Sequence, residues 1–253
     1  MKKIIILLVS TLLILSSCKE NVKAQVDEVN KPNDTELNSA EEYFYRGLSK
    51  YDLGDYKGAI SDYTRAIEIN PNNAVTYYNR GVSKIKLKDY KGAIADYTRA
   101  IEINSNYASA YYNRGTIKDD LQDYEGAISD YTRAIEINPN DASAYYNRGI
   151  LKIKLKDYKG AISDYTRAIE INPNEAYAYY NRGLVKHNLK DYEGAIADYT
   201  KAIEINPNYA DAFSNRGNSK EFLGDLSGAC ADWRKAANLG HTNSAEWVEK
   251  QCN

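Results

Sequence analysis

Residues 142–175 read ASAYYNRGILKIKLKDYKGAISDYTRAIEINPNE, and closely similar copies precede and follow this stretch without a break. The copies begin at Ala40, Ala74, Ala108, Ala142, Ala176 and Ala210. A fixed period of 34 residues is typical of repeat proteins, in which one unit cannot bury its apolar side alone and stacks on its neighbours. The sequence therefore predicts six equivalent units over residues 40–243.

Each copy predicts two helices, when its first alanine is counted as position 1. Positions 1 to 14 form the first helix and end at a leucine, and the aspartate at position 16 suits the N-cap of the second helix. The second helix stops at an asparagine, or at Gly240 in the last copy, because both residue types tolerate the left-handed conformation of a C-cap. Small residues at positions 8, 20 and 27 let the two helices approach closely, and tyrosines at positions 4, 17 and 24 fill the gaps.

This pattern resembles the tetratricopeptide repeat, with an aromatic residue at positions 4 and 24, Gly at 8, Ala at 20 and 27, and Pro at 32. The resemblance implies an all-α fold: a right-handed α-solenoid, or superhelix, of six helix-turn-helix repeats. The repeats are 40–73, 74–107, 108–141, 142–175, 176–209 and 210–243, and residues 244–253 are expected to form a C-terminal capping helix. The resemblance also implies that the first helices line a concave groove, which in this family usually holds a peptide or protein segment.

Two columns of charged residues run through the predicted interior. Position 7 is Arg and position 23 is Asp in every copy, and both fall on the faces along which the two helices of a hairpin meet. Because a lone buried charge is costly, we expect six structural ion pairs. They are Arg46–Asp62, Arg80–Asp96, Arg114–Asp130, Arg148–Asp164, Arg182–Asp198 and Arg216–Asp232. A row of arginines that binds anions is the alternative, and the lysine at position 11 is expected to lay its alkyl stem across Tyr and Ala.

The opposite side of the first helix predicts the partner-binding surface. In repeats 2 to 5 its residues are Tyr78, Asn79, Val82, Tyr112, Asn113, Thr116, Tyr146, Asn147, Ile150, Tyr180, Asn181, Leu184 and His187. Tyrosine offers a rigid apolar body with a polar tip, and an asparagine amide can pair with a peptide backbone. The alternative is that these tyrosines simply pack one first helix against the next. The asparagines match the carboxylate-gripping device of some co-chaperone relatives, but the lysines of that device are missing.

The first residues predict a lipid anchor. Two lysines precede a mostly apolar run over residues 4–15, and the sequence LSSC that ends at Cys18 resembles the lipobox of bacterial lipoproteins. The resemblance implies a signal peptide over residues 1–17, an acylated Cys18, and a place in the bacterial cell envelope, facing the periplasm or the cell surface. Residues 18–39 are polar and predict a flexible tether. An ordinary secretory cleavage site beside a cysteine is the alternative.

Two further cysteines, Cys230 and Cys252, lie in the last repeat and in the capping helix. Outside the cytoplasm an even pair of this kind suggests a disulfide, and two unpaired thiols are the alternative.

The composition narrows the classes of function. With 33 Lys and Arg against 35 Asp and Glu, the chain has no basic excess, and we expect no nucleic-acid partner. Its two histidines lack the spacing of metal ligands, and no catalytic motif stands outside the repeats, so we expect no metal, no cofactor and no enzyme. The sequence predicts a non-catalytic protein–protein interaction scaffold. A module that binds glycan or another envelope polymer through the same Tyr and Asn is the alternative.

Overall fold

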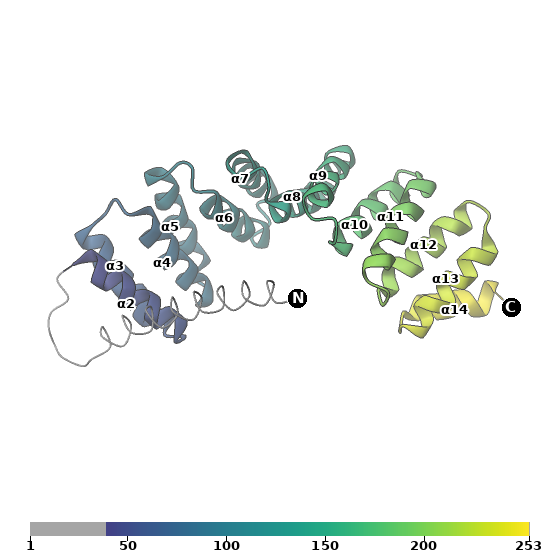
Figure 1. Ribbon diagram of the computed structural model, residues 1–253, viewed down its shortest axis with the longest axis horizontal. Coiled ribbons are helices and arrows are strands. Elements are labelled where there is room, and N and C mark those ends of the chain that lie inside the picture. Colours follow the sequence, from purple (N-terminus) through teal and green to yellow (C-terminus); the bar gives the residue numbers. More distant parts are fainter. Residues whose placement is uncertain (1–38, 253) are drawn as a thin grey trace, which may run out of the picture. The chain divides into compact units, whose positions relative to one another are not determined.

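The computed structural model describes residues 39–252, and all regular structure in this range is helical (Figure 1). The first helices of the six repeats are α2 (Ala40–Asp52), α4 (Ala74–Lys86), α6 (Ala108–Asp120), α8 (Ala142–Lys154), α10 (Ala176–Asn188) and α12 (Ala210–Phe222). The second helices are α3 (Tyr56–Ile69), α5 (Tyr90–Ile103), α7 (Tyr124–Ile137), α9 (Tyr158–Ile171), α11 (Tyr192–Ile205) and α13 (Leu226–Asn238). A last helix, α14 (Thr242–Gln251), follows them.

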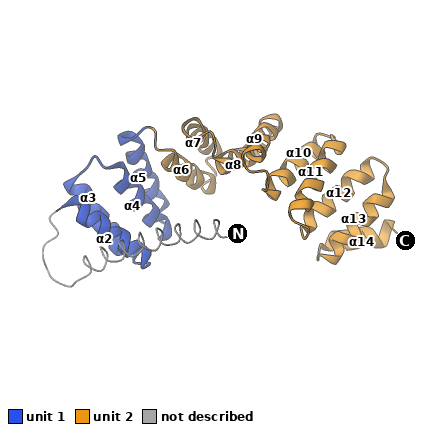
Figure 2. Cartoon of the chain, viewed as in Figure 1, with its two compact units in different colours: residues 1–105 blue, residues 106–253 orange. Residues whose placement is uncertain are grey.

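The chain forms two compact units, which divide between Ser105 and Asn106 (Figure 2). The first unit holds α2 to α5, and the second holds α6 to α14. Within each unit every helix packs on the next one along the chain, first inside a hairpin and then between hairpins. This consecutive packing of helix pairs is the arrangement of an α-solenoid built from tetratricopeptide-like repeats, as the sequence predicted.

The aspartates at position 16 are the N-caps of all six second helices. In the fourth repeat, for example, Asp157 Oδ1 accepts a hydrogen bond of 2.9 Å from the backbone N–H of Gly160. The first helices end one residue earlier than expected, at position 13, so that the leucine at position 14 is the C-cap. A side-chain cap satisfies one of the backbone N–H groups that a helix start leaves without an intrahelical partner.

The residues with a left-handed backbone conformation are not, for the most part, the C-caps of the second helices that the sequence predicted. The asparagines that end the second helices are not left-handed; Asn172, which precedes a proline, has φ −126°, and Asn104, which precedes Ser105, has φ −131°. Of the predicted stops only Gly240 has a positive φ, +94°. The left-handed residues lie instead at position 15, in the tight turn inside each hairpin. They are Gly54, Lys88, Gln122, Lys156, Lys190 and Gly224.

The core of each hairpin is made of alanine and tyrosine packed against glycine. A Cβ atom placed on Gly149 would lie only 3.0 Å from Cε1 of Tyr165, so the glycine is what allows the Tyr165 ring to lie against α8. In the second unit Tyr165 belongs to a buried cluster with Ala161 and Val185, on which Ile150 also packs. Because Val185 lies in α10, this cluster joins the fourth repeat to the fifth.

The C-terminal helix α14 covers the apolar end of α13. The rings of Trp233 and Trp247 lie 5.5 Å apart, and a disulfide joins Cys230 to Cys252, whose Cα atoms are 5.5 Å apart. Of the two alternatives for these cysteines, the structure therefore contains the bonded one. The predicted signal peptide, the acylated Cys18 and nearly all of the tether lie outside the described residues. No helix within residues 39–252 is long and apolar enough to span a bilayer.

Candidate functional site

The charged columns form the interior frame of the hairpins. In the fourth repeat Arg148 donates from Nη2 and Nε to the two carboxylate oxygens of Asp164, at 2.7 and 2.9 Å. Lys152 Nζ lies 2.8 Å from Oδ2 of the same carboxylate, which is 3% exposed. The sequence predicted the pairing of Arg with Asp, but for the lysine it predicted only contact of the alkyl stem with Tyr and Ala. Its strict recurrence in register with both partners was the signal that it belongs to the same group.

The same arrangement is present in every repeat. The pairs are Arg46–Asp62, Arg80–Asp96, Arg114–Asp130, Arg148–Asp164, Arg182–Asp198 and Arg216–Asp232, with Lys50, Lys84, Lys118, Lys152, Lys186 and Lys220 as third members. Burial alone would raise the pKa of Asp62, but hydrogen bonds from Arg46 and Lys50 hold it below its ordinary value. Arg148 also donates from Nη1 to Thr132 Oγ1 of the preceding repeat, at 3.0 Å. The arginines are thus committed to the frame and do not form an anion-binding row.

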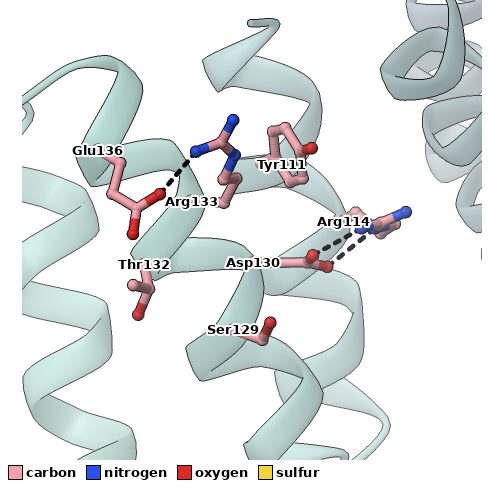
Figure 3. A pocket seen from close by; sticks show the side chains of 7 residues that line it. All are labelled: Tyr111, Arg114, Ser129, Asp130, Thr132, Arg133 and Glu136. Atoms are coloured by element: carbon pink, nitrogen blue, oxygen red, sulfur yellow. Dashed lines mark hydrogen bonds and ion pairs between the residues drawn. The ribbon is translucent and has the colours of Figure 1, made fainter. Parts of the chain in front are cut away.

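A hollow of about 400 Å³ lies beside α6 and α7, and its charges are already matched (Figure 3). Its lining residues are Tyr111, Arg114, Ser129, Asp130, Thr132, Arg133 and Glu136. Arg114 pairs with Asp130, and Arg133 Nη1 donates to Glu136 at 2.7 Å. Each charged side chain around this hollow therefore faces its own counter-ion.

The predicted Tyr and Asn column is a hydrogen-bonded ladder in the second unit. Asn147 Nδ2 donates to the hydroxyl of Tyr112, Asn181 donates to Tyr146, and the same bond follows from Asn215 to Tyr180, each at 2.9 Å. The ladder joins α6, α8, α10 and α12. The asparagine amide groups, which were expected to pair with a peptide backbone, therefore donate their hydrogen bonds to a neighbouring repeat instead. In the first unit Asn79 donates to the carbonyl of Val75 in its own helix.

The tyrosines of this ladder also pack inward. The ring centroids of Tyr146 and Tyr165 lie 5.8 Å apart, and Tyr112 and Tyr131 lie 5.5 Å apart. Burial raises the pKa of Tyr146, and it raises the pKa of Tyr180 to about 12. These ring contacts are with the second helix of the same hairpin. The alternative that the sequence left open, packing of one first helix against the next, is met by Tyr146, which also packs on a cluster that includes Ala178 of α10. Tyr112, Tyr146 and Tyr180 remain only half-buried.

A second hollow, of about 320 Å³, lies on the ladder between α8 and α10. Its lining residues are Tyr112, Ala142, Ser143, Tyr146, Asn147, Ala168, Asn172, Glu175 and Tyr177. Three of these, Tyr112, Tyr146 and Asn147, belong to the surface that the sequence predicted. Glu175 and Asn172 were missed because they lie in the connection between α9 and α10 and not on a first helix. We call these nine residues the α8–α10 hollow.

The other predicted residues of the surface are used in different ways. Ile150 packs on the cluster around Val185, and Thr116 is exposed and accepts from the hydroxyl of Tyr131 at 3.2 Å. His187 Nδ1 lies 2.8 Å from Ser219 Oγ, and burial lowers the pKa of its imidazole. Tyr78, Val82, Asn113 and Leu184 are half-buried. None of these residues lines the α8–α10 hollow.

A Ser-His-Asp set at the start of α14 has a structural role. His241 Nδ1 lies 2.9 Å from Ser244 Oγ, and His241 Nε2 lies 3.8 Å from Asp211 Oδ1. Ser244 is fully buried, and the same Nδ1 accepts the backbone N–H of Ser244 as the N-cap of α14. A nucleophile must reach its substrate, and this hydroxyl does not reach the surface. Within residues 39–252 no three His, Cys, Asp or Glu side chains are placed to hold a metal ion.

Two family models match the chain in the repeats just described. The model of the tetratricopeptide repeat matches residues 74–107, 142–175 and 176–209, and a second TPR repeat model matches residues 47–87 and 120–156. The chain belongs to the tetratricopeptide-repeat (TPR) family. No curated protein sequence matches it significantly.

Solved TPR structures resemble this chain over most of its length. YrrB, described as a TPR protein with an unusual peptide-binding site, is 26% identical with a TM-score of 0.68; the match covers 74% of this chain and 97% of YrrB. A MamA structure is also 26% identical, with a TM-score of 0.62 and coverage of 70% and 94%. The C-terminal part of a TPR protein from Cytophaga hutchinsonii, at 20% identity, shares the fold with a TM-score of 0.76 and coverage of 90% and 95%.

Proposed function

We propose that this TPR protein is a non-catalytic interaction scaffold that docks a peptide or protein segment over the α8–α10 hollow. The observation that carries the proposal is the hollow itself: tyrosine residues and the carboxylate of Glu175 line a cavity of about 320 Å³ beside the hydrogen-bonded ladder. The similarity to YrrB, whose peptide-binding site is named in its description, supports a peptide as the ligand.

The ladder makes this surface rigid before any partner arrives. Tyr112 and Tyr146 are each held by an amide from the next repeat and by a ring from their own hairpin. A binding surface whose side chains are already ordered loses little conformational entropy on association. Tyrosine adds a large contact area with only two side-chain torsions to fix.

Filling the hollow tests the proposal. The chain itself carries tyrosine at the position equivalent to Glu175 in two other repeats, as Tyr107 and Tyr209, so Glu175→Tyr is compatible with the repeat. Purified full-length protein and the E175Y variant are panned against a displayed library of random linear peptides. We expect the wild type to enrich a set of peptides that the variant fails to bind, with both proteins unfolding at similar temperatures.

Equal enrichment by the two proteins would place peptide docking elsewhere on the chain. A glycan array on the same pair covers the polymer-binding alternative: glycan binding that E175Y abolishes, without peptide enrichment, would replace the peptide proposal.

We also propose that acylated Cys18 anchors the protein in the bacterial cell envelope, outside the cytoplasm. The sequence LSSC after an apolar run supports this, as does the Cys230–Cys252 bond, because disulfides persist mainly in oxidising compartments. Metabolic labelling with an alkyne palmitate tests it: the wild type should incorporate label, and Cys18→Ser should incorporate none. Equal labelling of both would contradict the anchor.

A further inference from the structure

The α8–α10 hollow has one sign of charge. Glu175 is its single charged lining residue, and no Lys, Arg or His is among the nine. The Glu175 carboxylate is half-buried, and Oε1 accepts one long hydrogen bond, 3.4 Å, from the backbone N–H of Tyr177. An ionised carboxylate has about four acceptor sites, so most of its capacity is unused.

This carboxylate differs from its equivalent one repeat earlier. There Asp141 Oδ1 caps α8 with two hydrogen bonds, from the N–H groups of Ser143 at 3.0 Å and Ala144 at 3.3 Å. Glu175 has one more methylene and makes a single, weaker cap contact with α10. No ion pair within residues 39–252 includes Glu175, whereas Asp164, beneath the same repeat, pairs with both Arg148 and Lys152.

Three tyrosines line the same hollow as this carboxylate. Tyr112, Tyr146 and Tyr177 all line the hollow, and Tyr177 is 55% exposed. The faces of aromatic rings attract cations, with a strength that rises when the site excludes water. Burial raises the pKa of Tyr146, and the negative charge of Glu175 raises it further, which places that charge close to the ring.

We propose that the hollow receives a lysine or arginine side chain of the docked segment, with Glu175 as its counter-ion and the three tyrosines as its walls. The inference rests on the proposed function and names the chemistry of the partner. A volume of about 320 Å³ suits one long side chain and not a folded element. The rest of the segment lies along the ladder, where the tyrosine rings offer contact area without charge.

Binding of peptide pools that differ only in their central residue tests this inference. Four biotinylated, N-acetylated and C-amidated heptapeptide pools carry Lys, Arg, Glu or Leu at the centre and uncharged residues elsewhere. Their binding to full-length wild type, E175Q and E175Y is measured by biolayer interferometry. Gln keeps the length of the side chain and the cap oxygen of Glu175, so E175Q removes only the charge.

We expect the Lys and Arg pools to bind the wild type at least about ten-fold more tightly than the Leu pool, since a partly desolvated counter-ion and cation–π contacts act together. The preference should shrink to within about two-fold in E175Q and as the salt concentration rises. E175Y should weaken binding of all pools.

Two results would overturn the inference, and they separate it from the proposed function. If the Leu pool binds as tightly as the Lys and Arg pools, and E175Y still abolishes binding, peptides dock in the hollow but no cation is recognised. If no pool distinguishes wild type from E175Y, the docking proposal fails together with the inference. Thermal unfolding of both variants identifies a loss of fold, because an intact protein melts cooperatively near the wild-type temperature.

Discussion

The junction between α8 and α10 and the junction between α10 and α12 are built from the same sequence pattern but differ in sequence. Three of the differences fall on positions that line the α8–α10 hollow: Ser143, Glu175 and Tyr177 correspond to Tyr177, Tyr209 and Asp211. Position 34 is Glu175 at the first junction and Tyr209 at the second. The Tyr209 ring centroid lies 4.8 Å from that of Tyr180 and 5.4 Å from that of Tyr177. Tyr180 is the equivalent of Tyr146, which faces the α8–α10 hollow.

The frame beneath the two junctions is the same. Asp164 and Asp198 each hold an arginine and a lysine, and the ladder bond to Tyr146 has the same length as the bond to Tyr180. The comparison teaches that the interior sets the repeat, while side chains outside it differ between the junctions; among them, the Tyr209 ring packs on Tyr180 where Glu175 lies beside the hollow. If the proposed docking is right, a repeat protein can gain a binding site without any change in its core.

The largest effect is expected from removing the shared frame. Asp164→Ala or Asp198→Ala would leave two partly buried cations without their buried carboxylate, and each should cost about 3–5 kcal/mol of the free energy of unfolding. Urea unfolding of the second unit measures this cost. The control is Glu170→Ala, which breaks an exposed pair with Arg167 and should change stability by less than about 1 kcal/mol. A large difference between Asp164→Ala and Asp198→Ala would show that the two frames are not equivalent.

The disulfide should affect the cap far more than the hollow. It closes a loop with a sequence separation of 22 residues, so Cys230→Ser with Cys252→Ser should lower stability by about 3 kcal/mol in the chain-entropy model. Peptide binding by the folded double variant should stay within about two-fold of wild type, because α14 packs on α13 and not on α8 or α10. Loss of binding in the folded variant would show that the cap shapes the hollow.

Removing the Tyr209 ring from the junction between α10 and α12 should lower stability by a moderate amount. Tyr209→Glu removes ring contacts with Tyr180 and Tyr177, and we expect a loss of about 1–2 kcal/mol, measured by urea unfolding. The variant should also bind a second equivalent of a Lys-centred peptide. A stoichiometry that stays at one, in a folded variant, would mean that position 34 is not sufficient to open the surface.

The smallest expected effect is a gain in stability when a buried tyrosine hydroxyl is removed, and such a hydroxyl lies beneath each of the two junctions. The hydroxyls of Tyr165 and Tyr199 are buried and have no hydrogen-bond partner within the described chain. Replacing either with Phe should raise stability by about 1 kcal/mol, whereas Tyr131→Phe should lower it, because Tyr131 donates to Thr116. Chemical unfolding of the three variants gives the signs, and a loss in Tyr165→Phe would show that its hydroxyl is paired.

The strictly periodic features are the ones that sequence could predict. The aspartate caps, the Arg–Asp pairs and the packing of consecutive hairpins follow from positions that recur in every copy, so one repeat explains six. For the lysine at position 11, the sequence predicted contact with Tyr and Ala but not the ion pair with the aspartate at position 23. Whether the lysine ammonium group on the first helix reaches Oδ2 of the aspartate on the second helix depends on the distance between the two helices, which periodicity alone does not give.

The hollow could not be predicted, for two physical reasons. Glu175 lies in a connection, at a position that is Asn73, Tyr107, Asp141 or Tyr209 in other copies, so no period marks it. The ladder bonds join residues 35 apart, one more than the period, and they redirect the Asn amides from a partner to the next repeat. The left-handed turn residues were missed because Lys88, Gln122, Lys156 and Lys190 are not the residue types that usually mark this conformation.

Exchanging the two side chains tests most directly whether position 34 decides where the protein binds. A Lys-centred peptide that carries photo-leucine beside the lysine is irradiated with wild type and with the double variant E175Y and Y209E, and mass spectrometry maps the linked residues. The hollow in wild type predicts linkage to α8 and α10, and the exchange should move it one repeat along the chain, to α10 and α12, so that linkage to α8 is lost and linkage to α12 appears. Linkage that stays on α8 after the exchange, or that falls outside both junctions in wild type, would contradict the claim.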